Sequence, residues 1–170
     1  MLVRLKVNGE MVEISAPAHC TLLDWLREHL HLMGTRAACD LGDCGSCAVL
    51  IDGVATLSCV TLLVEARGRC VKTVEGLTWS GEAHPIQQAF HEMGASQCGF
   101  CTPGFVVSST ALIAENDHPS DEEIKDALSG NLCRCTGYSR IVEAVKRAAE
   151  IVRTEKACTP ATSPEDGVSR

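Results

Sequence analysis

The first part of the chain alternates apolar and polar positions, a pattern typical of strands with one buried face. In residues 3–7 apolar side chains alternate with Arg and Lys, and Asn8-Gly9 predicts a type I′ turn into a second strand over 12–14. A second turn of this kind is expected at residues 52–53, which are Asp-Gly. Further strands are expected over 47–51, 54–59 and 70–74. These signals predict a β-rich first half that closes near Gly76.

One helix is predicted to interrupt these strands. Thr21 and Asp24 have the spacing of a capping pair, in which the Thr side chain accepts a hydrogen bond from a backbone amide of the first helical turn. Gly34 is expected to end this helix. Its apolar positions fall on one stripe: Leu22, Leu23, Leu26 and Leu30.

The second half repeats apolar residues with the period of a helix. The first of its helices carries Ile86, Ala89, Phe90 and Met93 on one face. Thr102 is expected to be the N-cap of the second, which should continue to about residue 115. Helix starts are expected at four places: His84-Pro85, Thr102-Pro103, Ser120 with Glu123, and Ser139.

The change of period places a boundary between two domains and makes the fold class α+β. We expect a β-rich domain at residues 1–76, a linker at 77–84 that contains Gly81, and a helical domain at 85–155. Residues 156–170 contain prolines and no apolar period. A disordered tail is therefore expected there.

The composition excludes several classes of partner. The chain has 170 residues, of which 45% are hydrophobic, and its formal net charge is −7 without a basic cluster. Nucleic acid is therefore not expected as a partner. No apolar run approaches the roughly 18 residues that cross a bilayer, so no membrane span is expected. The first residues alternate apolar and charged side chains, unlike an export signal, and a cytoplasmic protein is expected.

The chain has eleven cysteines, and their spacing indicates its chemistry. In a reducing compartment, clustered thiols more often hold metal than form disulfides. Gly42 and Gly45 would let one cysteine-rich loop wrap tightly and turn backbone N–H groups toward sulfur. The first set has the spacing C-x4-C-x2-C-x11-C, whose beginning matches plant-type [2Fe–2S] proteins: Cys39, Cys44, Cys47 and Cys59.

A second set of four cysteines lies in the helical half. Two of its members come just before expected helix starts, where the positive end of the helix dipole favours thiolates and an anionic cluster. The spacing C-x2-C-x31-C-x-C predicts a second site of four thiolates. The second set consists of Cys98, Cys101, Cys133 and Cys135.

Zinc is the main alternative to iron–sulfur clusters at these sites. Cys44 with Cys47 and Cys98 with Cys101 form C-x-x-C pairs, and two separate Cys₄ zinc sites would use all eight thiols. The spacing does not match a [4Fe–4S] run, a Rieske centre with two His ligands or a thioredoxin-like motif. Three further thiols are expected to have no metal role, two as small buried residues and one in the tail: Cys20, Cys70 and Cys158.

Three motifs together resemble the iron–sulfur subunit of the molybdenum hydroxylases, the superfamily of xanthine dehydrogenase, aldehyde oxidoreductase and carbon monoxide dehydrogenase. They are the segment 34–47, the sequence Gln-Cys-Gly-Phe-Cys-Thr-Pro-Gly at 97–104 and the sequence Gly-Asn-Leu-Cys-Arg-Cys-Thr-Gly-Tyr at 130–138. The resemblance covers about residues 3–153 in order. The sequence departs from the family pattern at Ala38, where a Gly usually precedes the first cysteine. Because Gly tolerates backbone dihedral angles that Ala does not, the backbone conformation at Ala38 is expected to differ from that of the family.

The resemblance implies a ferredoxin-like β-grasp domain followed by a four-helix domain, each with one [2Fe–2S] cluster. It places the cluster of the helical domain beside the molybdopterin-type molybdenum cofactor of a large partner subunit, with Gln97 and Cys135 near the pterin. It also implies a medium subunit that binds FAD. The expected assembly is a hetero-oligomer such as a dimer of heterotrimers.

These implications predict an electron-transfer subunit that relays single electrons between the molybdenum centre and a flavin subunit or an external acceptor. The enzyme would be a multi-subunit molybdenum-containing oxidoreductase, with no substrate chemistry on this chain. Two alternatives remain open from the residues: a free-standing ferredoxin-like carrier and a zinc-stapled interaction module without a redox role.

Overall fold

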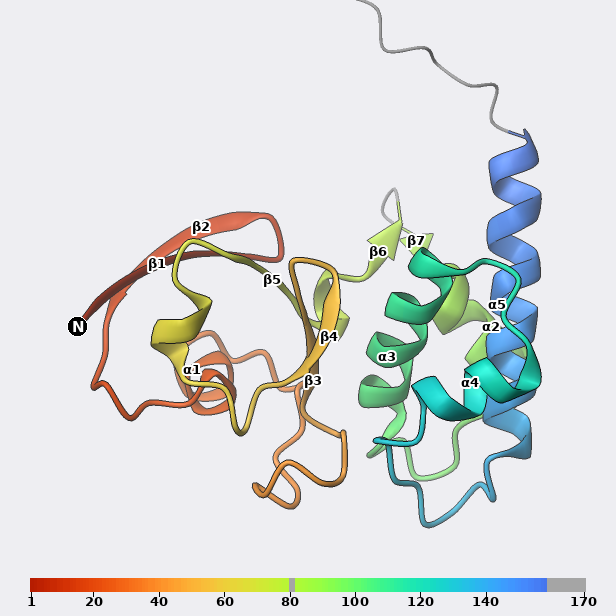
Figure 1. Ribbon diagram of the computed structural model, residues 1–170, viewed down its shortest axis with the longest axis horizontal. Coiled ribbons are helices and arrows are strands. Elements are labelled where there is room, and N and C mark those ends of the chain that lie inside the picture. Colours follow the sequence, from red (N-terminus) through yellow and green to blue (C-terminus); the bar gives the residue numbers. More distant parts are fainter. Residues whose placement is uncertain (80–81, 159–170) are drawn as a thin grey trace, which may run out of the picture.

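The structure is a computed structural model that describes residues 1–79 and 82–158 and consists of a β-rich half and a helical half (Figure 1). The β-rich half contains a five-stranded mixed sheet in the order β2-β1-β5-β3-β4. β1 pairs with β5 in parallel, and the other neighbours are antiparallel, as in a ferredoxin-like β-grasp fold. The strands are β1 (Leu2–Val7), β2 (Glu10–Ser15), β3 (Ala48–Ile51), β4 (Val54–Leu57) and β5 (Cys70–Lys72).

Both tight turns predicted from the sequence are confirmed. Asn8 and Gly9 have φ angles of 49° and 96°, and Asp52 and Gly53 have φ angles of 51° and 89°. A type I′ turn needs positive φ at both central residues, which Asn, Asp and Gly tolerate. The two hairpins therefore form where local sequence preference places them. β5 is shorter than expected, because a 3₁₀ turn, η2 (Val74–Gly76), follows it.

Helix α1 (Leu22–Glu28) packs on one face of the sheet. The Asp24 amide donates a hydrogen bond to the Thr21 side chain at 3.1 Å, so the predicted cap is confirmed. The helix ends at Glu28, with His29 as its C-cap, and not at Gly34; the chain then turns at His31, which takes a left-handed φ of 54°. A second 3₁₀ turn, η1 (Leu63–Ala66), also contributes to this core.

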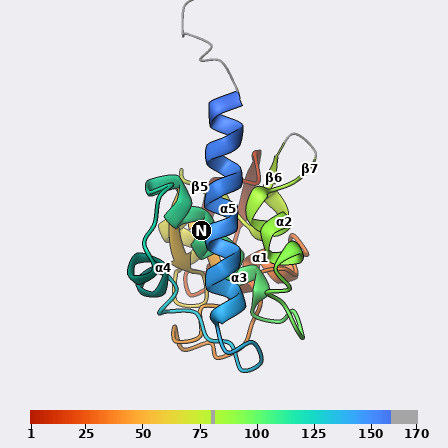
Figure 2. The same ribbon diagram turned by 90° about the vertical axis from the view of Figure 1, so that its right-hand side faces the viewer.

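The helical half contains the four predicted helices. They are α2 (Pro85–Glu92), α3 (Thr102–Glu115), α4 (Asp121–Ala127) and α5 (Ser139–Cys158). Figure 2 shows α5 along the outer side of this half, with α4 and α2 on either side of it. Among the described residues, no helix has the length and apolar character needed to span a bilayer.

Some expected details differ in the helical half and before it. A two-stranded ribbon, β6 (Thr78–Trp79) and β7 (Glu82–Ala83), lies within the expected linker, whose Gly81 lies outside the described residues. Thr102 is the first residue of α3 and not its N-cap, which is Cys101. α5 continues through residues 156–158, and the rest of the expected tail lies outside the described residues.

β3 joins the two halves because it is buried on both faces. Val49 and Ile51 face the core that the sheet forms with α1. Ala48 and Leu50 belong to the core of the helical half, where they pack with residues of α3 such as Phe105. The sheet is thus covered by α1 on one face and by α3 on the other, and the two halves are packed against each other (Figure 1).

Candidate metal centres

The loops that carry the two cysteine sets lie at the same end of the molecule, the lower end in Figures 1 and 2. The loop before β3 carries three members of the first set, and Cys59 follows β4. The second set lies on the loops between α2 and α3 and between α4 and α5, with Cys101 as the N-cap of α3. The N-terminal end of α3 therefore adjoins the second set, as the sequence predicts.

The thiols of the first set contact one another in two pairs. Cys39 interacts with Cys44, and Cys47 interacts with Cys59. The β3–β4 hairpin forms the second pair, because Ala48 lies opposite Leu57 and so brings the residues that flank them together. The charge of Cys39 also acts on Cys59, which places the two pairs next to each other.

Backbone amides of the loop are directed at these sulfur atoms. The Gly42 amide interacts with Cys59, and Gly42 and Gly45 take left-handed φ angles of 82° and 70°. Burial is the larger influence on Cys59 and, together with the neighbouring Cys47, raises the pKa of its thiol to about 11. Three amides lower the pKa of the Cys39 thiol to about 7: those of Leu41, Cys44 and Asp43.

Ala38, the position that departs from the family pattern, does not take a backbone conformation that requires glycine. Its φ is not positive, and the left-handed position in this part of the loop is Asp40, with a φ of 52°. Asp tolerates this region better than most residues. The loop therefore turns without a glycine before Cys39.

The second set is also arranged in two pairs. The sulfur atoms of Cys98 and Cys135 are 3.8 Å apart, and Cys101 interacts with Cys133. The charge of Cys98 also acts on Cys101, and that of Cys133 acts on Cys135. Residues that are far apart in the sequence are thus neighbours in space.

Thr136 is the principal hydrogen-bond donor to the second set. Its hydroxyl and its amide donate to the sulfur of Cys133 at 3.1 Å and 3.4 Å, and the Cys135 amide does so at 3.5 Å. Burial opposes the Cys133 thiolate, but these donors lower the pKa of Cys133 to about 7. Burial and the neighbouring Cys133 raise the pKa of Cys101 to about 12.

The donor chemistry of both sets fits a [2Fe–2S] cluster. Such a cluster takes four thiolates, two on each iron, and its charge is stabilised by N–H and O–H groups directed at sulfur. A cavity of about 220 Å³ is lined by all four thiols of the second set and also by Cys44 of the first. Among the described residues, no three His, Cys, Asp or Glu side chains are grouped so that they could hold a single metal ion.

The two cysteine sets are connected by direct contacts between their loops. The Leu132 amide, next to Cys133, donates a hydrogen bond to the carbonyl oxygen of Cys44 at 2.9 Å. The guanidinium group of Arg36, in the first loop, lies 5.7 Å from the centre of the Phe100 ring in the second, which is cation–π geometry. The two sites are therefore adjacent, with no element between the loops at these contacts.

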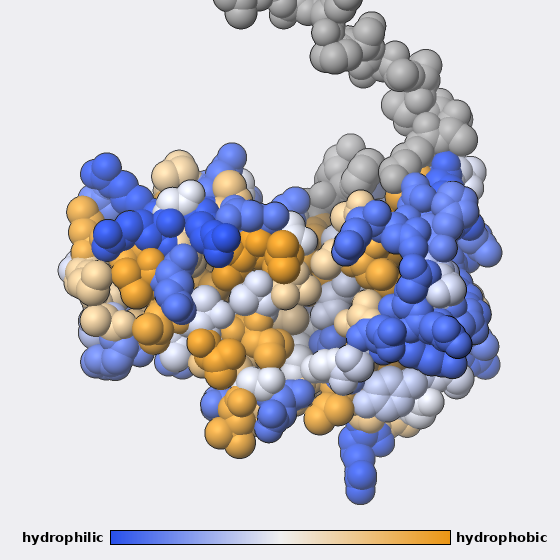
Figure 3. Space-filling model, in the orientation of Figure 1, coloured by the Kyte–Doolittle hydropathy of each residue, from blue (hydrophilic) through white to orange (hydrophobic). Residues whose placement is uncertain are grey.

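The surface around the second set is accessible to a partner. Gln97 and Cys135, the two positions expected near a pterin, are both exposed. Large apolar side chains are also exposed on the cysteine loops, including Phe100, Leu132 and Leu41. Figure 3 shows apolar surface over the β-rich half, whereas the helical half is mostly hydrophilic on this face.

The three remaining thiols lie apart from both sets or outside the described side chains. Cys70 was expected to be buried, but it is exposed. The alternation of β5 turns Val71 toward the core and Cys70 away from it. Cys20 is half-buried and packs against the core of the β-rich half. The side chain of Cys158 lies outside the described part of the structure.

Three polar residues of the third motif were not identified as part of the site from the sequence. Thr136 donates to sulfur, and Asn131 and Tyr138 hold the loop around Cys133. A hydroxyl residue directly after Cys135 is a local signal for a donor to sulfur. The roles of Asn131 and Tyr138 depend on contacts with distant segments and have no such signal.

Comparisons with known proteins agree with this chemistry. Residues 5–69 match the family described as "2Fe-2S iron-sulfur cluster binding domain", and residues 73–146 match the "[2Fe-2S] binding domain" family. Together these two matches cover both cysteine sets.

The chain is similar over most of its length to curated and solved proteins. It is 48% identical to the nicotine 6-hydroxylase small subunit of Paenarthrobacter nicotinovorans over 143 residues, 84% of this chain and 86% of the relative. It is 39% identical to the aldehyde oxidoreductase iron-sulfur-binding subunit PaoA of Escherichia coli, covering 91% of this chain and 74% of the relative. A chain of quinoline 2-oxidoreductase from Pseudomonas putida 86 superposes with a TM-score of 0.86 at 41% identity, covering 91% of this chain and 96% of that chain.

Proposed function

The chain belongs to the family of iron–sulfur subunits of the molybdenum hydroxylases, and we propose that it relays single electrons between a molybdenum centre and an acceptor on other subunits. It contributes to an oxidoreductase as an electron-transfer subunit. The observation that carries the proposal is the pairing of eight thiols into two adjacent sets, each with N–H or O–H donors directed at sulfur. Two [2Fe–2S] clusters are the cofactors of this chain.

We propose that each pair of thiols holds one iron ion. In the first set the pairs are Cys39 with Cys44 and Cys47 with Cys59. In the second set they are Cys98 with Cys135 and Cys101 with Cys133. Contacts within each pair support this assignment, because two thiolates on one iron must be neighbours.

When bound, a [2Fe–2S] cluster takes up and releases one electron at a time. The residues of this chain set how easily it does so. Thr136 and the loop amides stabilise negative charge on sulfur, and the burial of Cys47 limits the access of water to the first set. The hydrogen bond between Leu132 and Cys44 keeps the two loops in contact.

We propose that the chain works within a complex that contains a large molybdopterin-binding subunit. Exposed Gln97 and Cys135 would lie near the pterin, and the exposed Phe100 and Leu132 would be covered by that large subunit. A medium FAD-binding subunit would lie nearer the first set, and the complete assembly would be a dimer of heterotrimers. The described cysteines form no disulfide, and this supports a reducing compartment, the cytoplasm, as the location of the complex.

Metal analysis and spectroscopy of the complex test the proposal. The full chain is purified anaerobically with the subunits that accompany it, and iron, zinc and acid-labile sulfide are measured per chain. We expect about 4 iron and about 4 sulfide per chain, and two distinct paramagnetic signals after reduction with dithionite.

The outcomes separate the proposal from its alternatives. Zinc without sulfide or colour would support a zinc-stapled module and overturn the redox function. Two clusters on an 18.1 kDa species that carries electrons without companion subunits would support a free-standing carrier. Co-purifying chains with molybdenum and flavin would support the complete assembly.

A further inference from the structure

Asn131 is a buried polar residue that joins the two cysteine loops. It is 4% exposed, and its side-chain amide donates a hydrogen bond to the carbonyl oxygen of Gly45 at 3.1 Å, across 86 residues of sequence. Gly45 lies between Cys44 and Cys47 of the first set, and Asn131 lies shortly before Cys133 of the second. A buried side-chain amide without a partner is costly, so this bond constrains the position of both loops.

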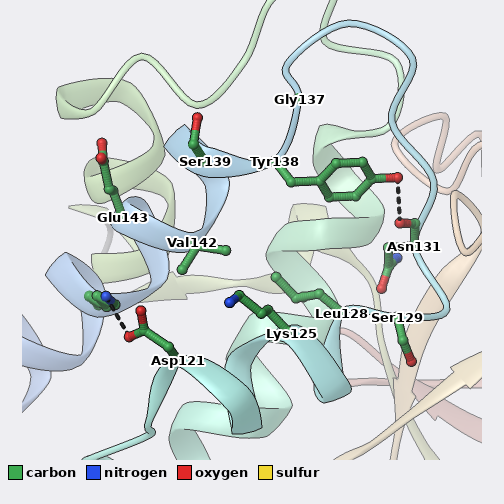
Figure 4. A pocket seen from close by; sticks show the side chains of 11 residues that line it. Asp121, Lys125, Leu128, Ser129, Asn131, Gly137, Tyr138, Ser139, Val142 and Glu143 are labelled. Carbon is green, nitrogen blue, oxygen red and sulfur yellow. Dashed lines mark hydrogen bonds and ion pairs between the residues drawn. The ribbon is translucent and has the colours of Figure 1, made fainter.

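Tyr138 holds the same loop from its other end. Its hydroxyl accepts a hydrogen bond from the Cys133 amide at 2.9 Å. It also donates one to the Asn131 carbonyl oxygen at 3.4 Å (Figure 4). Its ring packs edge-on against the fully buried ring of Phe105 in α3, with centroids 6.0 Å apart. The hydroxyl is therefore fixed by the helical core and closes residues 131–138 into a compact loop.

We infer that Asn131 and Tyr138 are positioning residues that set the relative position of the two cysteine sets and thereby the electronic coupling between their clusters. Asn131 joins the second loop to Gly45, and Tyr138 keeps the Cys133 amide and the Asn131 carbonyl in place behind that contact. The inference rests on the proposed function and adds to it the residues that control transfer between the sites. One electron that leaves one cluster is accepted by the other, so the exchange needs no further reactant.

The arrangement has a consequence for the second set in particular. The Cys133 amide donates to the Tyr138 hydroxyl and is therefore not available to sulfur. Without the hydroxyl, this amide would turn to sulfur or the loop would open to water. Both changes stabilise the more negative, reduced form and raise the reduction potential.

The test compares two variants and a matched control in the full chain, purified with its accompanying subunits. Tyr138→Phe removes only the hydroxyl, and Asn131→Asp removes the donor to Gly45 with little change of shape. The control is Asn8→Asp in the β-rich half. It removes a similar donor, because the Asn8 side-chain amide donates a hydrogen bond to the Thr73 hydroxyl at 3.0 Å. For each protein, iron content, thermal stability, the two reduction potentials and the magnetic interaction between the reduced clusters are measured.

We expect all three variants to lose some stability and to keep about 4 iron per chain. Tyr138→Phe should weaken the magnetic interaction between the two clusters, and it should also raise the potential of the second-set cluster while leaving that of the first-set cluster unchanged. Asn131→Asp should weaken the magnetic interaction between the two clusters. Asn8→Asp should change neither quantity.

Three results would overturn the inference. If either Tyr138→Phe or Asn131→Asp keeps the magnetic interaction of the wild type, the role of that residue is structural. If Tyr138→Phe loses iron, its hydroxyl serves cluster retention and not the contact between loops. If Asn131→Asp loses iron, the same conclusion holds for the Asn131 amide. Failure of the proposed function is distinguishable, because the wild type would then either give no cluster signals or give them on an 18.1 kDa species without companion subunits.

Discussion

Gly104, in the first turn of α3, lies against the carbonyl oxygen of Gly45, so that a Cβ atom on Gly104 would be less than 3.0 Å from that oxygen. Gly45 is itself enclosed, because a Cβ there would meet Gly130 and Asn131. Two glycines thus allow α3 to approach the loop of the first cysteine set at backbone distance. This approach brings the helical half and the β-rich half together at their cysteine loops.

Replacing Gly104 should therefore separate the loops. Gly104→Ala is expected to destabilise the protein by about 1–3 kcal/mol, the usual cost of overpacking where the neighbouring atom is backbone. The matched control is Gly130→Ala, because a Cβ on Gly130 would meet no atom within 4 Å. Urea unfolding of the two variants measures the difference, and equal stability would show that α3 moves away without cost.

Single cysteine replacements should affect one cluster at a time. Cys39→Ser removes a thiol from the first set and Cys135→Ser removes one from the second, so each variant should retain about 2 iron per chain and one paramagnetic signal. Cys70→Ser is the control, because Cys70 is exposed and belongs to neither set. Loss of both signals from either variant would mean that the sites do not assemble independently.

Removing both clusters should destabilise the chain more than any single substitution. Each half is near the size of about 70–80 residues at which a hydrophobic core supplies only about 3–5 kcal/mol, whereas a metal centre can add about 10 kcal/mol. After anaerobic chelation we expect a lower unfolding temperature by circular dichroism and faster amide exchange in the cysteine loops.

The strands of the β-rich half should be less affected by this treatment. Their core, which contains Leu5, Trp25 and Val49, is formed by apolar side chains and not by the first set. Equal exchange in the loops before and after chelation would contradict a contribution of the clusters to folding.

The N-cap of α2 should make stability depend on pH. His84 accepts a hydrogen bond from the Ile86 amide at 3.3 Å through Nδ1, and burial, together with nearby Lys72, lowers its pKa below the ordinary value of 6.5. The unfolded chain therefore binds the proton more readily, and stability is lost as the pH falls through 6.5. The loss should reach about 1 kcal/mol, the usual contribution of a helix cap.

His84→Asn tests this dependence, because Asn also caps helices and does not titrate. Urea unfolding between about pH 5 and 8 should show the loss in the wild type and a flatter profile in the variant. His19→Asn, at an exposed turn residue, is the control and should keep the wild-type profile. Parallel profiles for the wild type and His84→Asn would exclude the cap as the cause.

Features that depend on near neighbours in the chain could be predicted from the sequence alone. The Asn8-Gly9 and Asp52-Gly53 turns form because those residues tolerate positive φ, and Thr21 caps α1 because its partner is only three residues away. The cysteine spacing indicated two sites of four thiolates. For the first set this signal is local, because one loop holds three of its four members. Together with the segment 34–47, the motifs at 97–104 and 130–138 indicated the protein family.

Only the tertiary structure decided which surfaces meet. β3 is buried on both faces because α3 covers the face that α1 leaves open, and Cys70 is exposed because the register of β5 directs Val71 inward. The contact of Asn131 with Gly45 likewise joins segments that the sequence separates widely. Local preferences act over a few residues, whereas burial and hydrogen bonding between distant segments depend on how the whole chain packs.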